Sequence, residues 1–139
     1  MPALSEVEVG TELPAREFNL QRMNLVQYAG ASGDFNPIHW NERIATAVGL
    51  PNVIAHGMLT MATTGRVVTD WAGDPGRVVS YGVRFSAPVV VPDDDKGATL
   101  TVAGVVEEKN DDGTVVVGLT ATVDGQKVLM GAKAVVRLG

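Results

Sequence analysis

The sequence predicts an α+β protein in which a curved antiparallel β-sheet wraps one long central helix. Valine supplies 23 of the 139 residues, and 16 of these valines lie from Val78 onward. Because β-branched side chains favour strands, the C-terminal half is expected to form the sheet. The helix is predicted over residues 57–71, where apolar and small residues recur at spacings of three and four. The length favours a single domain that spans residues 1–139.

Four strands are predicted in the second half of the chain, over residues 77–87, 98–109, 114–123 and 127–138. They are separated by the segments PDDDKG, NDDG and DG, and the last two contain Asp-Gly steps that favour tight hairpins. We therefore expect the four strands to follow one another as an antiparallel meander. These strands are longer than the usual length of about 5 to 6 residues, so the sheet should be strongly curved.

The first half of the chain predicts two shorter helices and one strand. The helices are expected over residues 22–31 and 41–48. The second begins at Asn41, a residue type that caps helix N-termini, and ends before Gly49 and Pro51. Residues 13–20 are expected to add an edge strand to the sheet.

The composition argues against several classes of protein and partner. The formal net charge is −5, so no overall positive field is available to attract nucleic acid. The chain has no cysteine, which excludes disulfide scaffolds, thiolate metal sites and cysteine nucleophiles. It has neither an apolar run of about 18 residues nor a secretory signal at the N-terminus. We therefore expect a cytoplasmic protein with no membrane partner.

The stretch YAGASGDFNPIHW, residues 28–40, places Asp34 five residues before His39, one of only two histidines. Gly33 allows backbone conformations that other residues resist, and the Asn36-Pro37 step favours an extended or turned chain. We therefore expect Asp34 and His39 to lie on an ordered loop and to converge on one small molecule. A carboxylate and an imidazole that share a water or a substrate hydroxyl can transfer a proton near neutral pH.

A second motif, IAHGML at residues 54–59, places His56 and Gly57 immediately before the long helix. The first amides of a helix have no partner within the helix, and the helix dipole is positive at that end. These amides suit a carbonyl oxygen that gains negative charge during a reaction. A side chain at position 57 would obstruct the approach of the carbonyl oxygen to these amides, which explains why glycine is found there.

Each motif also has a structural interpretation. The string Gly-Asp-x-Asn-Pro forms a stable turn, in which Asp34 and Asn36 bond the local backbone. His39 alone would fit a buried, hydrogen-bonded histidine, and His56 is expected mainly to fix the loop before the helix. Zinc is disfavoured, because two histidines 17 residues apart without cysteine supply too few ligands. A Ser-His-Asp hydrolase is disfavoured because no nucleophile elbow is present.

Taken together, YAGASGDFNPIHW and IAHGML resemble the hydratase motif of the MaoC-like (R)-specific enoyl hydratases and dehydratases. The resemblance extends over most of the chain, from about Val7, and implies a hot-dog fold, an antiparallel sheet curled around one long helix. Within the family, the segments GDFNPIHW, IAHGMLTM, WAGDPG and YGVRF are most similar to the HadB-type catalytic subunits of (3R)-hydroxyacyl-ACP dehydratases.

The resemblance implies roles for four residues. Asp34 and His39 would be the catalytic pair, Asn36 would orient the aspartate, and the amide of Gly57 would hold the thioester carbonyl. Which member of the pair performs each proton transfer stays open. The implied reaction dehydrates a (3R)-hydroxyacyl thioester to a trans-2-enoyl thioester and water. It would serve type II fatty acid synthesis that elongates mycolic acid precursors.

No cofactor or metal is implied by the resemblance. The implied partners are an acyl thioester on acyl carrier protein or coenzyme A, and a related non-catalytic hot-dog subunit in a heterodimer, with a homodimer as the alternative. An (R)-specific enoyl-CoA hydratase is the main alternative function. A hot-dog thioesterase and a non-catalytic subunit are further alternatives. The thioesterase would release free thiol from the substrate, and the non-catalytic subunit would have no activity.

Overall fold

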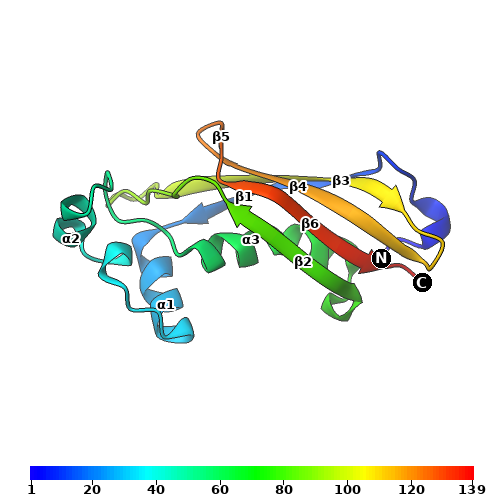
Figure 1. Ribbon diagram of the computed structural model, residues 1–139, viewed down its shortest axis with the longest axis horizontal. Coiled ribbons are helices and arrows are strands. Elements are labelled where there is room, and N and C mark those ends of the chain that lie inside the picture. Colours follow the sequence, from blue (N-terminus) through cyan, green and yellow to red (C-terminus); the bar gives the residue numbers. More distant parts are fainter.

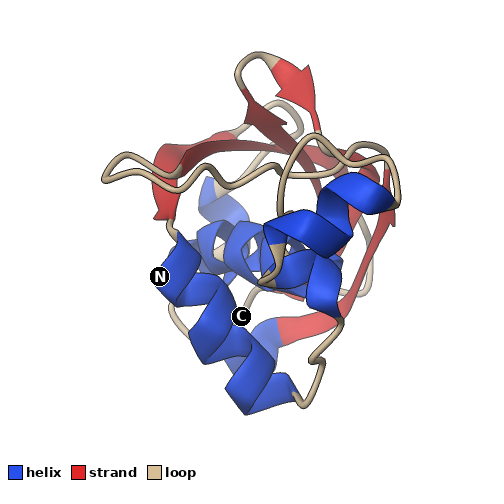
Figure 2. Cartoon of the chain, turned by 90° about the vertical axis from the view of Figure 1, so that its left-hand side faces the viewer, coloured by secondary structure: helices blue, strands red, loops and turns tan.

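Helix α3 (Gly57–Ala72) lies along a curved antiparallel sheet in the computed structural model, which describes residues 1–139 (Figure 1). The sheet contains β1 (Glu12–Leu20), β2 (Val78–Phe85), β3 (Ala98–Lys109), β4 (Thr114–Val123), β5 (Gln126–Lys127) and β6 (Leu129–Arg137). The other helices are α1 (Arg22–Ser32), α2 (Glu42–Ala47) and the short 3₁₀ helices η1 (Leu4–Glu6), η2 (Pro37–His39) and η3 (Pro75–Arg77). Figure 2 shows the helices gathered on the inner side of the curved sheet. The α+β architecture predicted from the sequence is confirmed.

The strand order is β1-β3-β4-β6-β2, with antiparallel neighbours, and β5 pairs only with β4. The predicted edge strand and the meander of β3, β4 and β6 are therefore confirmed. The meander is wrong for β2, which pairs with β6 at the far edge instead of with β3. The reason lies in residues 86–97, which do not turn back beside β2. The amide of Ala55 donates to Val89 O at 2.8 Å, and the amide of Val91 donates to Val53 O at 3.1 Å.

The predicted hairpin at Asp124-Gly125 forms as the sequence indicates. Both residues have positive φ angles, 50° for Asp124 and 76° for Gly125. Two successive positive φ values are characteristic of a type I′ turn, whose twist matches that of the flanking strands. The turn joins β4 to β5, with Val123 paired to Gln126.

The hydrophobic core fills the space between α3 and the sheet. Along β3, the buried residues Ala98, Leu100 and Val102 alternate with more exposed ones, because successive side chains of a strand point to opposite faces. They belong to one continuous cluster with Val67 and Val68 of α3. The apolar spacing that predicted the helix therefore also identifies the face that it buries.

Strand β2 is fixed to α3 through Tyr81. Its hydroxyl donates a hydrogen bond to Met61 O at 2.7 Å, and burial raises the pKa of Tyr81 to about 12. A Cβ atom on Gly65 would lie only 3.0 Å from Tyr81 Cε1. Gly65 therefore lets the aromatic ring approach the helix backbone. None of the helices has both the length and the hydropathy required to cross a lipid bilayer.

Candidate active site

The loop that carries Asp34 begins where α1 ends. Gly33 terminates the helix in the left-handed conformation, with φ of 75°, so the chain turns sharply just before Asp34. Asp34 Oδ1 then accepts a hydrogen bond from the Asn36 amide at 3.1 Å. The Asn36 side chain itself accepts from the Ile38 amide at 3.2 Å and caps η2. Asn36 thus holds the Asp34 carboxylate through its backbone amide, whereas its side chain holds the next turn.

His39 is oriented by the backbone of Ile54. The Nδ1 atom of His39 lies 2.7 Å from Ile54 O, and the amide of Ile54 donates to Ile38 O at 3.1 Å. Since a carbonyl oxygen only accepts, the proton of a neutral His39 ring is on Nδ1. The Nε2 atom is then free to exchange a proton with another group. His39 is a buried residue, only 7% exposed.

The free Nε2 atom of His39 lies 3.8 Å from Asp34 Oδ2. This distance is too long for a direct hydrogen bond. It suits an oxygen atom of water or of a substrate hydroxyl placed between the two groups, at ordinary hydrogen-bond distance from each. Asp34 is half exposed, so its carboxylate is accessible at the surface of the loop. The two residues that the sequence predicts as a pair are therefore brought together.

His56 contacts both members of this pair, whereas the sequence predicted mainly a role in fixing the loop before the helix. Its ring stacks on that of His39, with centroids 3.8 Å apart and planes inclined by 22°, and it meets Tyr28 edge-on at 4.8 Å. Its Nε2 atom lies 3.1 Å from Asp34 O and donates to that carbonyl, whereas Nδ1 is buried without a partner. Burial lowers the pKa of His56 and the nearby His39 lowers it further, although the hydrogen bond to Asp34 O opposes both.

Asp34, His39 and His56 each place one possible metal-ligand atom within 4.8 Å of the others. The nitrogen lone pairs of an imidazole lie in the plane of its ring. Stacked rings inclined by only 22° direct these lone pairs along nearly parallel planes, not toward a common point. One nitrogen of each ring also faces a backbone carbonyl. The cluster thus lacks the convergent arrangement of a tetrahedral zinc site.

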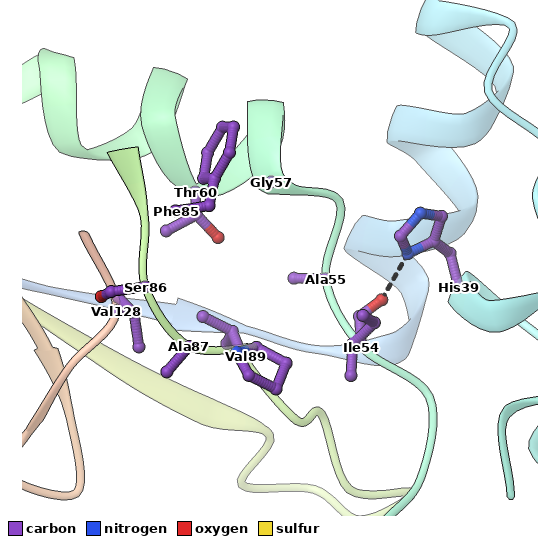
Figure 3. A pocket seen from close by; sticks show the side chains of 11 residues that line it. His39, Ile54, Ala55, Gly57, Thr60, Phe85, Ser86, Ala87, Val89 and Val128 are labelled. Carbon is purple, nitrogen blue, oxygen red and sulfur yellow. Dashed lines mark hydrogen bonds between the residues drawn. The ribbon is translucent and has the colours of Figure 1, made fainter. Parts of the chain in front are cut away.

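Gly57 is the first residue of α3, and its amide has no acceptor within the chain. It lines a pocket of about 390 Å³, together with His39 from the loop. Figure 3 shows this pocket between the start of α3, Ala55 and the chain that follows β2. Gly57, which carries the free amide, therefore lines the same pocket as His39, whereas Asp34 is not among the residues that line it.

The far wall of the pocket was not identified from the sequence. It consists of Phe85, Ser86, Ala87, Pro88, Val89 and Val128. This wall is mainly apolar, and all of it except Val128 comes from the end of β2 and the residues after it. The place of β2 in the sheet differs from the prediction. Phe85 lies in the segment YGVRF, but no motif marks the others, because residues 86–91 reach the site by running beside residues 53–55 and Val128 by its hydrogen bond with Ser86.

Arg22 connects the segments around the site. Its guanidinium donates to Val91 O at 2.6 Å, to Glu42 Oε1 at 2.8 Å and to Asn52 Oδ1 at 3.0 Å. The hydrogen bond from Arg22 lowers the pKa of Glu42, and a second from Asn52 acts in the same direction. One side chain of α1 thus links α2, the loop before α3 and the segment that follows the pocket wall.

A sequence profile described as "MaoC like domain" matches residues 5–125. The chain is 35% identical over 117 residues to the (R)-specific enoyl-CoA hydratase of Rhodospirillum rubrum, over 84% of this chain and 78% of that protein. It is 39% identical over 79 residues to 3-hydroxyacyl-thioester dehydratase X of Mycobacterium tuberculosis. That alignment covers 57% of this chain but only 27% of the relative.

Two solved structures are similar over nearly the whole chain. A protein described as "MaoC-like dehydratase" has a TM-score of 0.95 at 44% identity, covering 99% of this chain and 42% of that one. The ChsH1-ChsH2 complex from Mycobacterium tuberculosis has a TM-score of 0.82 at 26% identity, covering 95% and 98%. The hot-dog fold implied by the sequence resemblance is therefore confirmed. Since the profile covers most of its length, the chain belongs to the MaoC-like family of hydro-lyases.

Proposed function

We propose that the chain interconverts (3R)-hydroxyacyl thioesters and trans-2-enoyl thioesters. In the dehydration direction, the acid-base pair removes a proton from C2. The electron pair of that C–H bond forms the C2–C3 double bond, and the C3–O bond breaks. The departing hydroxyl takes up a proton from the pair and leaves as water. Hydration is the reverse, and neither direction requires an oxidant or a cofactor.

The observation that supports this proposal is the position of His39, which lies beside Asp34 and also lines a pocket with Gly57. His39 Nε2 and the Asp34 carboxylate lie 3.8 Å apart, and Gly57, the residue with the free amide, lines the pocket that His39 also lines. Removal of a proton beside a thioester carbonyl places negative charge on the carbonyl oxygen, which a helix N-terminal amide stabilises. The pair supplies the proton donor and acceptor, and the amide supplies the charge stabilisation.

The assay uses crotonyl-CoA as the hydration substrate. We expect loss of the enoyl thioester absorbance, a (3R)-hydroxybutyryl product and no free thiol. His39→Ala and Asp34→Asn should each reduce kcat by about 10²- to 10⁴-fold, while the unfolding transition is retained. Release of thiol would identify a thioesterase instead. Near-normal turnover by either folded variant would show that the pair does not carry the reaction.

Two candidate functions differ in the carrier of the acyl group, which is either acyl carrier protein or coenzyme A. The similarity to HadB-type subunits supports the catalytic subunit of a carrier-protein dehydratase in type II fatty acid synthesis, acting on mycolic acid precursors. The relative from Rhodospirillum rubrum, which is similar over most of both chains, is named an (R)-specific enoyl-CoA hydratase and supports the second candidate. We favour the dehydratase. A kcat/KM for acyl carrier protein substrates well above that for matched coenzyme A substrates is expected, and the reverse preference identifies the hydratase.

We propose that the active form is a heterodimer with a related hot-dog subunit that lacks the acid-base pair. Strand β2 is an edge strand, and Val79, Phe85 and the nearby helix residue Met58 are each more than half exposed. Apolar side chains beside an open strand edge favour association. The similarity to one component of the ChsH1-ChsH2 complex supports a paired assembly. Co-purification with a chain of similar size is the expected result, whereas an active self-paired protein would establish the homodimer.

A further inference from the structure

Three residues that line the pocket have polar side chains: His39, Thr60 and Ser86. Two of them form a hydrogen bond within the chain. His39 Nδ1 donates to Ile54 O at 2.7 Å, and Ser86 Oγ donates to Lys127 O at 3.1 Å. The Thr60 hydroxyl is different. No residue that lines the pocket hydrogen-bonds it, although Thr60 is only 3% exposed (Figure 3).

The direction of the Thr60 side chain explains why its hydroxyl is free. A threonine within a helix commonly donates back to the carbonyl four residues earlier. Thr46 does so in α2, where its hydroxyl donates to Glu42 O at 2.8 Å. In Figure 3 the Thr60 oxygen instead points into the pocket, toward the space beside Ala55. A nearly buried hydroxyl that faces a cavity without a partner is suited to a polar ligand atom.

The helix geometry places this hydroxyl close to the free amide of Gly57. Residues three apart on a helix lie on the same face, and side chains lean toward the helix N-terminus. Thr60 therefore leans back over the turn that begins at Gly57, and both residues line the same pocket. An acceptor oxygen placed beside the N-terminus of α3 would meet an N–H group from one residue and an O–H group from the other.

We infer that the Thr60 hydroxyl is a second hydrogen-bond donor to the thioester carbonyl oxygen, beside the amide of Gly57. This inference rests on the proposed function. When the C2 proton leaves, the electron pair delocalises into the thioester carbonyl and charge collects on its oxygen. Two donors from one helix turn then hold that oxygen, and the same contact fixes C2 relative to His39. Thr60 is thus a catalytic residue in addition to the pair.

Thr60→Val and Thr60→Ser separate this role from packing. Valine keeps the branched shape of the side chain and removes the hydroxyl, whereas serine keeps the hydroxyl and removes a methyl group. We expect Thr60→Val to lower kcat for crotonyl-CoA by about 10²-fold, the effect typical of removing one such donor, with a smaller change in KM. Thr60→Ser should stay within about threefold of the unaltered protein. If Thr60 were needed only for packing, Thr60→Ser would lower kcat more than Thr60→Val, and the inference would be wrong.

Thr64 provides the matched control, because it lies one turn later on the same helix. Its hydroxyl is also without a partner, but it is fully enclosed and outside the pocket lining. Thr64→Val should therefore leave kcat unchanged. Thr60→Ala repeats the removal of the hydroxyl without adding a methyl group, so the conclusion does not depend on how valine packs. Thermal unfolding of all four variants accompanies the kinetics.

Asp34→Asn is measured in parallel to separate this inference from the proposed function. Loss of activity in Asp34→Asn together with near-normal kcat in folded Thr60→Val overturns the role of Thr60 and leaves the acid-base proposal in place. Near-normal kcat in Asp34→Asn overturns the acid-base proposal itself. Loss of activity in both, with recovery in Thr60→Ser, supports both.

Discussion

The imidazole rings of His39 and His56 stack with centroids 3.8 Å apart, although 17 residues separate them in the chain. A positive charge on one ring opposes a positive charge on the other. Burial lowers the pKa of His56, and its Nε2 atom already donates to Asp34 O, so the Nε2 atom of His39 is the ring nitrogen placed for proton transfer with Asp34. Under the proposed function, His56 is expected to position this imidazole, because its ring stacks on His39 and its Nε2 atom donates to Asp34 O.

Two substitutions at His56 separate these two contacts. His56→Gln retains an N–H donor near the position of Nε2 and loses the stack, whereas His56→Phe retains a flat ring and loses the donor. Loss of the hydrogen bond to Asp34 O should lower kcat of His56→Phe by 3- to 10-fold or so relative to the unaltered protein, since one such bond contributes about 0.5–1.5 kcal/mol. A kcat of His56→Phe equal to that of the unaltered protein would assign no functional part to the hydrogen bond.

Stability should fall in mild acid because of His56. Burial lowers the pKa of His56 from its usual 6.5 in the folded protein. As the pH drops below that value, the unfolded chain binds a proton that the folded chain does not, so the free energy of unfolding decreases. Urea unfolding at pH 8 and pH 5 measures the effect. His56→Gln should reduce the difference between the two, and an unaltered difference would assign it to other groups.

Gly57→Ala should impair activity much more than stability. The added Cβ would lie 3.0 Å from Phe85 Cε1, but Phe85 is 55% exposed and its ring is free to move away. We expect a change of less than about 1 kcal/mol in the free energy of unfolding, because the ring yields at little cost. The methyl group would still obstruct the helix amide, so kcat/KM should fall by about 10²-fold.

The double variant Gly57→Ala, Phe85→Ala provides the control for that interpretation. Removal of the Phe85 ring eliminates the steric contact and leaves the methyl group beside the amide. Activity should therefore remain low in the double variant. Recovery of kcat/KM would trace the defect to displacement of Phe85 instead of to obstruction of the amide.

Gly65→Ala should be destabilising although alanine favours helices. Its Cβ would lie 3.0 Å from Tyr81 Cε1, and the Tyr81 ring is held by its hydrogen bond to Met61 O. Overpacking of this kind costs about 1–3 kcal/mol, more than the roughly 1 kcal/mol that replacing glycine contributes to a helix. A double-mutant cycle with Tyr81→Ala tests the contact, because additive effects would show that the two residues do not interact.

Asn36→Ala should affect stability more directly than chemistry. The Asn36 side chain caps η2 through the Ile38 amide, and loss of such a cap costs about 0.5–2 kcal/mol. The backbone amide that holds Asp34 Oδ1 remains in the variant. Its kcat should therefore lie well above that of Asp34→Asn in the crotonyl-CoA assay. A loss as large as that of Asp34→Asn would show that the Asn36 side chain itself orients the carboxylate.

The sequence was sufficient for the elements whose pattern is local. The spacing of apolar residues identified α3, and the valine-rich runs between PDDDKG, NDDG and the Asp124-Gly125 step identified β3 and β4 to the residue. The partner of β2 was not predictable in the same way. Its burial does not alternate, and its position depends on the path of residues 86–97, which run beside residues 53–55 before β3 begins. No short-range signal in the sequence indicates that path.

The same distinction between local patterns and long-range contacts applies to the residues of the site. Asp34, His39 and Gly57 lie within two short motifs, so their residue types and spacing were enough to group them. The stack of His56 on His39 depends on the path of the chain between the motifs, and no pattern in the sequence indicates it. Thr60 had one available signal, a hydroxyl one helix turn after Gly57, but only the shape of the pocket shows that it faces inward.

The two sides of the pocket come from separate parts of the chain, and this division has a consequence for how such proteins diversify. The groups proposed for the chemistry lie within residues 34–60, whereas Phe85, Ser86, Ala87, Pro88, Val89 and Val128 form the opposite side. Under the proposed function, substitutions in that second set should alter which acyl tails are accommodated without disturbing proton transfer. Exchange of residues 85–89 between homologues is therefore a route to new tail-length preferences on an unchanged reaction centre.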